Sequence, residues 1–383
     1  MPLEQYALVD DPGRLIAELD SLAGLDPVGV DVERADSNRY FRAAALIQVG
    51  GAGRVALIDP LALADLAPLE AFLTERLAVF HALENDVQPL ESLGVRIGQV
   101  ADTAIAAALL GLPTGLESLL FELLGVELAA DKSAMQRADW EARPMEEGML
   151  AYAAADVADL PALWADLDVR LHAAGRFDWY VEELAARLAQ PAVEDRRDWR
   201  RTRGIGRLDT AALARVRALW DIRETLAKTT DTAPGRIASD KTLVDLATNP
   251  PKATRELGRR GMRRQAVRDF GDALLTALAD VSDAPSAAVA PRTSRRVTDE
   301  DRSQADRLRV LRARRAEELG IEAGVLCPSR VLMTAVLTDP TTPEQLRAAL
   351  DLRDWQWDQL ADVFGEALDF GSEGTGAGEE PTA

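Results

Sequence analysis

Cysteine and histidine are nearly absent from this chain of 383 residues, which contains one cysteine, Cys327, and two histidines, His81 and His172. A single cysteine excludes an intramolecular disulfide framework and any zinc site built on cysteine pairs. Two histidines leave little scope for a histidine-rich metal site. We interpret Cys327 as a small buried apolar residue.

Long apolar runs are absent as well. No stretch approaches the roughly 18 apolar residues needed to span a membrane, and the first residues, MPLEQYALVDDPG, lack the basic and apolar regions of a secretory signal. We therefore expect a cytoplasmic protein with no membrane partner. Hydrophobic residues still make up 47% of the chain, which excludes general disorder and, at this length, predicts two or three domains.

Acidic residues outnumber basic ones by 64 to 44, which gives a formal net charge of −20. Taken alone, this charge argues against a nucleic-acid partner, because phosphate contacts need lysine and arginine. The charge is unevenly distributed, however. Residues 1–190 carry 32 acids and 13 bases, whereas residues 191–270 carry 11 acids and 19 bases. The chain thus contains a basic segment, with a net charge of +8, inside an otherwise acidic protein.

Two segments have the composition of linkers. Residues 190–207 are polar and rich in arginine without periodicity, and residues 282–298 are rich in proline, alanine and serine. These linkers predict three domains and a disordered tail, at 1–190, 208–281, 299–370 and 371–383. The two later domains can be distant copies of one small helical module.

The first domain alternates short apolar segments with helical patterns. The sequence predicts strands at 6–9, 28–33, 44–49, 55–59 and 79–81. The third and fourth strands are joined by a few residues, which indicates an antiparallel hairpin. The pattern is mostly helical from Asp102 onward, and Pro144 is placed to start a helix through Tyr152 and Asp156. We therefore expect an α/β domain with a mixed sheet, and no strand beyond residue 208.

Asp31 and Glu33 end an apolar strand and lie two residues apart, so their side chains share one face of the sheet. Val28, Val30 and Val32 then face the opposite way, into the core. Two adjacent carboxylates repel each other unless a cation lies between them, and oxygen ligands suit Mg²⁺ or Mn²⁺. The alternative is that the strand simply ends here with two solvated acids.

Two further features carry carboxylates. Asp86 follows a buried strand in HALENDV and can equally be an ordinary helix N-cap. Tyr152 and Asp156 are spaced i, i+4, which places both on one helix face. Alanines around them would let a substrate come close, and a tyrosine beside a metal-bound carboxylate can orient a water or take its proton. The alternative for this pair is an ordinary surface helix.

The order of these features along the chain is more informative than any one of them. Asp-x-Glu on a strand, an aspartate after a later strand, and Tyr-x-x-x-Asp on a helix form the pattern of a two-metal 3′–5′ exonuclease. In-line hydrolysis of a phosphodiester uses two cations about 4 Å apart, one activating water and one stabilising the leaving 3′ oxygen. Four carboxylates can hold both ions.

The sequence resembles bacterial ribonuclease D, a family in the tyrosine-containing branch of the DEDD exonucleases. The resemblance covers residues 1–185 and is carried by GVDVERADSNRYFRAAALIQVG, ALIDPLAL, VFHALENDV, DTAIAAALLG, DKSAMQRADWEARPM and LAYAAADVADLPALW. Residues 209–262 are similar to the HRDC helical domain, and residues 301–370 to a more diverged second copy. The resemblance implies a ribonuclease H-like α/β exonuclease domain followed by two all-α HRDC-like domains.

The resemblance also implies site roles. Asp31, Glu33 and Asp156 would hold the metal that activates water. Asp31 and Asp86 would help to hold a second metal. Tyr152 would position or deprotonate the nucleophile. Asp102 would organise structure. The sequence departs from its relatives at Arg34, at Ala138 and near Glu84, and none of these departures removes a ligand. The implied activity releases nucleoside 5′-monophosphates from RNA with a free 3′ end, with precursor tRNA as the substrate. Three domains around one site would suffice without a partner, so we expect a monomer.

Basic residues predict where RNA binds. We expect phosphate contacts from Lys132, Arg137 and Arg143, and from an arginine cluster beside glycine turns, Arg255, Arg259, Arg260, Arg263 and Arg264. Trp199, in the arginine-rich linker, is a candidate for stacking on a base. The alternative for these arginines is a solvated basic face. Two other functions stay open, a DNA-directed 3′–5′ exonuclease and a non-catalytic RNA-binding protein with a decayed exonuclease fold.

Overall fold

The structure is a computed structural model that describes residues 5–34, 39–41, 43–51, 53–128, 138–190, 197–281, 297–368 and 370. Its contacts divide the chain into two compact units. The first unit comprises residues 1–100, 128–161 and 189–293, and the second comprises residues 101–127, 162–188 and 294–383. The predicted tail at 371–383 and most of the second predicted linker lie outside the described residues. No described helix is both long and apolar enough to cross a membrane.

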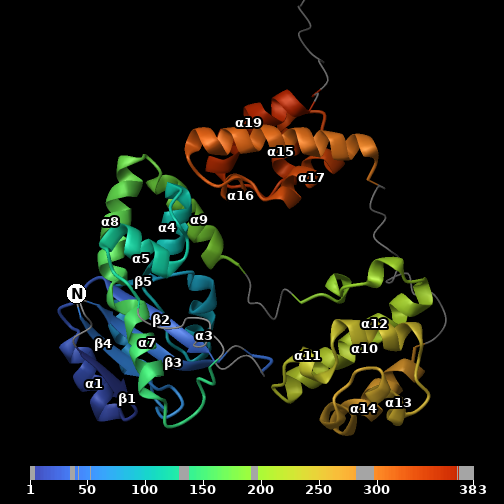
Figure 1. The fold of residues 1–383 in the computed structure, drawn as a ribbon, viewed down its shortest axis with the longest axis horizontal. Helices are drawn as coiled ribbons and strands as arrows, with labels where there is room; N and C mark the ends of the chain where they lie inside the picture. The colour runs from blue at the N-terminus through green and yellow to red at the C-terminus, as the bar shows by residue number, and fades with distance from the viewer. Residues whose placement is uncertain are drawn as a thin grey trace, which may run out of the picture. The chain divides into compact units, whose positions relative to one another are not determined.

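A mixed β-sheet organises the first unit (Figure 1). Its strand order is β1-β4-β3-β2-β5-β6. β1 pairs with β4 and β2 with β5 in parallel, while β3 is antiparallel to both β2 and β4. The strands are β1 Gln5–Val9, β2 Val28–Arg34, β3 Ala44–Gly51, β4 Arg54–Ile58, β5 Leu77–Phe80 and β6 Gln99–Asp102. The mixed sheet and the β3–β4 hairpin confirm the sequence predictions, while β6 was not predicted.

Helices cover the sheet. α1 (Pro12–Ser21) packs on β1, and α7 (Glu147–Ala158) packs across β2, β3 and β4 (Figure 1). Asp11 caps α1 by accepting a hydrogen bond from the N–H of Arg14 at 3.0 Å. α7 carries Tyr152 and Asp156, as predicted, but it begins at Glu147, three residues after the predicted start at Pro144, and a new helix begins at Leu160. The shorter helices of this layer are α2 Ala67–Thr74 and α3 Val87–Ser92.

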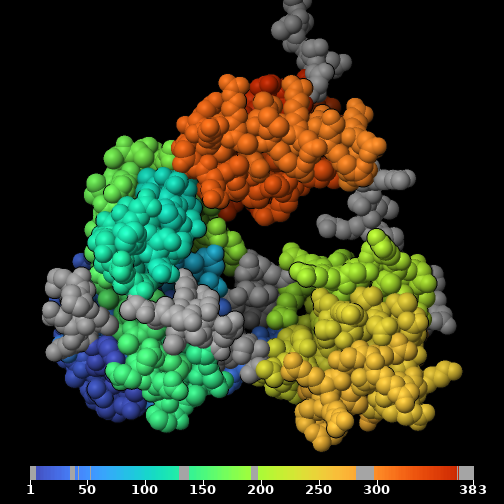
Figure 2. Space-filling view, in the orientation of Figure 1, coloured from blue at the N-terminus to red at the C-terminus, as the bar shows by residue number. Residues whose placement is uncertain are grey.

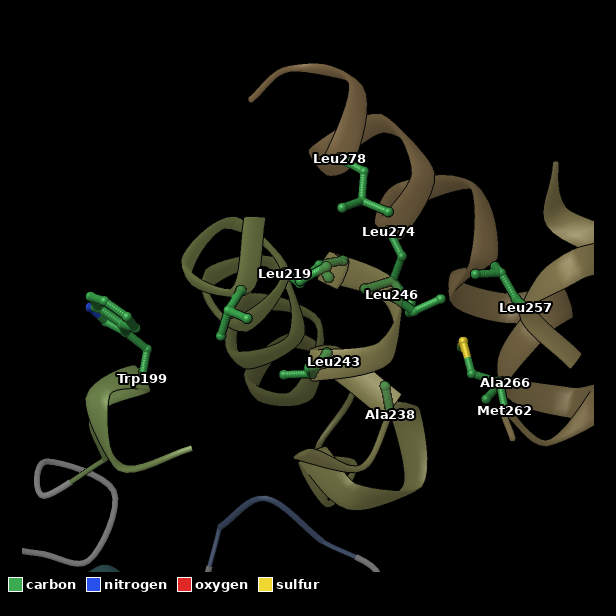
Figure 3. Packing of buried hydrophobic residues seen from close by; sticks show 12 residues of the cluster. Trp199, Leu219, Ala238, Leu243, Leu246, Leu257, Met262, Ala266, Leu274 and Leu278 are labelled. Carbon is green, nitrogen blue, oxygen red and sulfur yellow. The ribbon is translucent and has the colours of Figure 1, made fainter. Parts of the chain in front are cut away.

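Residues 199–279 of the first unit form a helical module with its own apolar core (Figure 3). Its helices are α10 Thr210–Thr229, α11 Pro234–Ile237, α12 Asp240–Thr248, α13 Thr254–Arg259 and α14 Arg264–Ala279. Figure 2 shows the yellow-to-gold atoms of these helices packed closely together. Trp199, on the 3₁₀ turn η3 (Trp199–Arg201), is only 8% exposed and belongs to this core. Trp199 therefore packs in the core of the module instead of offering a stacking surface for RNA.

A polar contact joins this module to the sheet domain within the first unit. One carboxylate oxygen of Asp231, which follows α10, accepts hydrogen bonds from the backbone N–H groups of Tyr40 and Phe41, both at 3.1 Å. The other oxygen accepts from Arg39 at 3.0 Å. The buried Tyr40 ring packs against Ala227 of α10. Residues 39–41 are thus fixed to the module.

The second unit is all helical among its described residues beyond β6. Its helices are α4 Thr103–Leu110, α5 Leu116–Leu124, most of α8 Leu160–Ala173, α9 Phe177–Leu188, α15 Asp299–Leu319, α16 Ala323–Leu326, α17 Ser329–Thr338, α18 Pro343–Ala349 and α19 Asp354–Ala367. Trp355 of α19 is 2% exposed and stacks on Trp179 with ring centroids 4.7 Å apart. Its indole N–H donates to Glu183 at 3.1 Å. Trp355 is a core residue, and Cys327 is buried, as predicted.

The two helical modules repeat the same internal bonds. In the first, Arg223 donates to the carbonyl of Ala238, 15 residues later, at 3.0 Å and to a side chain 17 residues later. In the second, Arg312 donates to the carbonyl of Cys327, again 15 residues later, at 2.6 Å and to a side chain 17 residues later. In both modules the helices, α10 to α14 and α15 to α19, also follow one another in the same order of lengths. These shared details support two copies of one module.

Candidate metal centre

Asp31 and Glu33 lie on one face of β2, as the strand alternation predicts. Val28 and Val30 on the other face are fully buried, and Val32 is 5% exposed. β2 is a central strand between β3 and β5, so the carboxylates are carried by a rigid part of the sheet. The sequence analysis left open that the strand simply ends here with two solvated acids. Both carboxylates are instead partly buried.

Gly29 determines how closely α7 approaches these carboxylates. A Cβ atom at Gly29 would lie 2.4 Å from the carbonyl oxygen of Val157, so only glycine allows this contact. Gly29 shares the face of Asp31 and Glu33, and Val157 directly follows Asp156. Ala153 and Ala154 are fully buried and bring the helix close to the sheet. These two alanines therefore pack the helix against the sheet. From the sequence we had expected the alanines around Tyr152 and Asp156 to let a substrate come close.

The packing of α7 on β2 brings three carboxylates together. One carboxylate oxygen each from Asp31, Glu33 and Asp156 lies within 4.8 Å of the others. Burial raises the pKa of Glu33 to about 9, with further increases from the negative charges of Asp31 and Asp156, while Arg34 acts in the opposite direction. Without a cation the cluster therefore holds a proton at neutral pH. A hard divalent cation would replace that proton, so the donor set fits such a metal.

Tyr152 lies one turn before Asp156 on α7, and its hydroxyl is hydrogen-bonded to the Asp156 carboxylate. Burial is the largest cause of the raised pKa of Tyr152. The charge of Asp156, this hydrogen bond, and the charges of Glu33 and Asp31 raise it further. The phenol is therefore neutral and donates a hydrogen bond to the carboxylate. The ring of Trp140 lies beside it, with centroids 6.4 Å apart.

Asp86 follows β5, the parallel neighbour of β2, and is 3% exposed. It occupies the N-cap position of α3, yet its side chain makes no capping hydrogen bond. The alternative interpretation, that Asp86 is an ordinary helix N-cap, thus does not account for this buried carboxylate. Asp86 is outside the group of three carboxylates that lie within 4.8 Å of one another.

Asp102 has a structural role, as the resemblance implied. Its carboxylate caps α4 by accepting from the N–H groups of Ala104 at 2.8 Å and Ile105 at 2.9 Å. Its own backbone N–H donates to the hydroxyl of Tyr180 at 2.8 Å. The side chain is fully buried.

Arg143 is held by groups of the protein. Its guanidinium donates to both oxygens of the buried Asp59, at 2.6 and 2.8 Å. It also donates to the carbonyls of Ala45, Trp140 and Ala142. Because these acceptors engage both terminal nitrogens and Nε, the geometry does not favour the phosphate contact predicted for Arg143. No local pattern in the sequence indicates that Asp59 is the partner of Arg143.

The predicted RNA-binding residues have different surroundings. Lys132 and Arg137 lie outside the described residues. Four arginines are exposed around the turn between α13 and α14, where Gly261 has φ +93°: Arg255, Arg259, Arg263 and Arg264. Arg260 is half-buried and paired with Asp245 at 3.1 Å. We call the four exposed residues the arginine cluster.

Comparisons with known proteins define the class. The 3′–5′ exonuclease family matches residues 6–172, and the HRDC domain family matches residues 212–278. This chain is thus a 3′–5′ exonuclease of the DEDD fold with an HRDC domain behind it. It is 31% identical to Ribonuclease D from Zymomonas mobilis, covering 85% of this chain and 86% of that protein. It is 35% identical to Ribonuclease D from Acidiphilium cryptum, covering 73% of each.

A solved structure agrees with these relatives. The crystal structure of Escherichia coli RNase D, described as an exoribonuclease involved in structured RNA processing, matches with a TM-score of 0.75 and 25% identity. The match covers 95% of this chain and 98% of that one. The chain belongs to the ribonuclease D family and is a 3′–5′ exoribonuclease, a hydrolase. The α/β exonuclease domain followed by HRDC-type helices confirms the predicted fold class.

Proposed function

We propose that this exoribonuclease trims the 3′ ends of precursor tRNAs in the cytoplasm by two-metal hydrolysis, and that it acts as a monomer and releases nucleoside 5′-monophosphates. The observation that carries the proposal is the convergence of Asp31, Glu33 and Asp156 within 4.8 Å. Three carboxylates this close are stable together when divalent cations compensate their charge. Mg²⁺ and Mn²⁺ both suit such oxygen ligands.

Asp31, Glu33 and Asp156 would hold the ion at which water is activated, and Asp31 together with Asp86 would hold a second. The ions would supply an activated water and stabilise the leaving 3′ oxygen. The burial of Asp86 just after β5, the parallel neighbour of β2, supports a ligand role at the edge of this cluster.

Tyr152 would position the attacking water. Its raised pKa supports positioning over proton removal, because a neutral phenol is a hydrogen-bond donor and a poor base. The hydroxyl already contacts Asp156, so a water held by that carboxylate would lie within its reach.

The arginine cluster would bind the RNA backbone. Four exposed guanidinium groups beside a glycine turn can contact phosphates at several positions of a strand. The basic character of residues 191–270 supports this role, since the sheet domain itself is acidic.

The test compares matched substrates that end in the same sequence. The full chain with Mg²⁺ or Mn²⁺ would be given a tRNA with a 3′ extension, the same RNA blocked by a 3′-phosphate, and a DNA strand of equal length. We expect stepwise shortening of the extended tRNA and a large loss of rate on the other two. Faster degradation of DNA would instead assign a DNA-directed exonuclease, and equal cleavage of the blocked RNA would refute the requirement for a free 3′ end.

A further inference from the structure

Phe41 exposes a large apolar ring next to the strand that carries the carboxylates. Its exposed fraction is 48%, and it lies in the segment that joins β2 to β3. β3 begins at Ala44, which pairs with Arg34, the residue after Glu33. Three residues of chain span at most about 11 Å. The backbone of Phe41 therefore lies within that distance of Ala44, at the end of β2 that carries Glu33.

The helical module holds this ring in place through Asp231. The N–H groups of Tyr40 and Phe41 both donate to one carboxylate oxygen of Asp231. Asp231 adopts φ +43°, a left-handed conformation that is unfavourable for a residue with a Cβ atom. The rings of Phe41 and Tyr40 pack in a T-shaped arrangement with centroids 5.0 Å apart, and Tyr40 is 3% exposed. Because the exposed ring is already ordered, a ligand that stacks on it meets a lower entropic cost.

Lys228 brings a positive charge to the same place. It lies on the last turn of α10, and its ammonium is 5.7 Å from the centre of the Tyr40 ring. Lys228 is exposed and forms no ion pair with any residue that the structure describes. Arg39 is also close, but its guanidinium is paired with both Asp231 and Glu141. Lys228 is thus the cation that is available to a phosphate group.

We propose that Phe41 and Lys228 form an RNA subsite, in which a base near the 3′ end stacks on Phe41 and a neighbouring phosphate contacts Lys228. An exposed aromatic ring beside a cation is the combination with which proteins bind single-stranded nucleic acid without reading its sequence. The subsite rests on the proposed function, because it requires a single-stranded RNA end as the substrate. It takes its aromatic ring from the sheet domain and its cation from the helical module, and it is separate from the arginine cluster.

A protein partner is the other possible occupant of an exposed apolar ring. Protein contacts use contiguous apolar patches, whereas the side chains placed around Phe41 by these contacts are the charged Arg39, Asp231 and Lys228 and the buried Tyr40. This setting favours a nucleic-acid strand, which offers a flat base and a phosphate together.

Binding of short single-stranded RNAs to the full chain tests the subsite, with chelator present to prevent hydrolysis. Each RNA lacks the base at one position and keeps the sugar-phosphate backbone. We expect the wild type to bind one of these strands, abasic near the 3′ end, about tenfold more weakly than the intact strand, which is the size of a lost base stack. Phe41→Ala should bind the intact strand about tenfold more weakly, and the same abasic position should then cause no further loss.

Phe121→Ala is the matched control. Phe121 is 58% exposed, but it lies on α5 one turn after Glu117 and next to Glu122, where acidic side chains repel a phosphate. This variant should bind every strand as the wild type does.

Two further variants separate stacking from charge. Phe41→Trp keeps an aromatic surface and should retain the affinity and the abasic effect. Lys228→Gln should keep the abasic effect and reduce the slope of log binding constant against log salt by about 0.7. Thermal melting checks that each variant folds.

The subsite is overturned if the wild type binds all abasic strands as it binds the intact one, if it binds no RNA, or if folded Phe41→Ala keeps wild-type affinity. Sedimentation without RNA addresses the protein alternative, since self-association that Phe41→Ala removes would assign the ring to a contact between chains and contradict the subsite. RNA trimming with Mn²⁺ is measured in parallel. A wild type that shows the abasic effect and trims no RNA contradicts the proposed function alone, whereas one that trims RNA without any abasic effect contradicts the subsite alone.

Discussion

The carbonyl oxygen of Val157 lies where a side chain at Gly29 would begin, 2.4 Å from the position of its Cβ. This contact lets α7 touch β2, and it joins the two halves of the candidate metal centre. Asp31 and Glu33 come from the strand, and Tyr152 and Asp156 come from the helix. The spacing of the cluster thus depends on a residue that contributes no ligand.

Gly29→Ala should weaken both stability and activity. The added methyl group meets backbone that cannot rotate away, so the helix must move and the protein should lose about 1–3 kcal/mol of unfolding free energy. Asp156 would move with the helix, and kcat should fall. Denaturant unfolding and RNA hydrolysis measure the two effects.

Gly148→Ala is the matched control, because it makes the same substitution on α7 where no atom lies within 4 Å of the new Cβ. It should be neutral or stabilising, since alanine favours a helix more than glycine does. Equal behaviour of the two variants would contradict the packing account.

Metal affinity should rise with pH. The pKa of Glu33 is raised to about 9 by burial and by its neighbouring carboxylates, from an ordinary value of 4.5. Between these values the folded metal-free protein holds a proton that the unfolded chain does not, so its stability falls as pH rises. A metal ion must displace this proton, and binding should therefore strengthen from pH 6 towards pH 9.

Calorimetry of Mg²⁺ and Mn²⁺ binding in buffers of different ionisation enthalpy measures the released proton. Glu33→Gln, which removes the titrating group, should bind metal more weakly with a flatter pH dependence. Metal binding that releases no proton at pH 7 would show that the cluster is already fully ionised.

Tyr152→Phe should separate binding from chemistry. The variant loses the hydroxyl that contacts Asp156 and keeps the ring beside Trp140, so RNA and metal affinity should stay near wild type while kcat falls by about 10²-fold because the water is no longer positioned. Tyr6→Phe is the control, since that hydroxyl is hydrogen-bonded to Glu147 at the start of the same helix. A wild-type rate for Tyr152→Phe would remove this residue from the mechanism.

Arg143 and Arg264 should respond in opposite ways. Arg143→Gln leaves Asp59, which is 4% exposed, without its cation and should cost about 3 kcal/mol of stability. Arg264→Gln, in the exposed arginine cluster, should leave stability unchanged and reduce the slope of log binding constant against log salt by about 0.7 for a single strand. Unfolding and RNA-binding titrations of both variants provide the measurement. Loss of RNA binding by a fully stable Arg143→Gln would restore the phosphate role.

Local periodicity made most of the carboxylate cluster predictable. Alternation along β2 placed Asp31 and Glu33 on one face, and the i, i+4 spacing did the same for Tyr152 and Asp156. Partners distant in sequence were not predictable. Asp231 binds the backbone of Tyr40 across 191 residues, and no local pattern indicates this contact. β6 was missed because its four residues, QVAD, contain no apolar run.

Trp199 illustrates the same limit. Its arginine-rich surroundings favoured an exposed base-stacking residue, yet its ring is buried in the core of the first helical module. The composition of a segment describes its average polarity, whereas the burial of one side chain depends on the surface against which the segment packs. The net charge of −20 is a further case, since it argued against RNA for a chain that belongs to a ribonuclease family.

A time course on 3′-extended tRNA with the wild type and Asp31→Asn, each with Mg²⁺, Mn²⁺ or chelator, tests the central claim most directly. We expect the wild type with metal to give products shortened by one nucleotide at a time and to release nucleoside 5′-monophosphates. Chelator and Asp31→Asn should both reduce hydrolysis to background while RNA binding persists. Wild-type rates from Asp31→Asn, or stepwise trimming in chelator, would contradict the account.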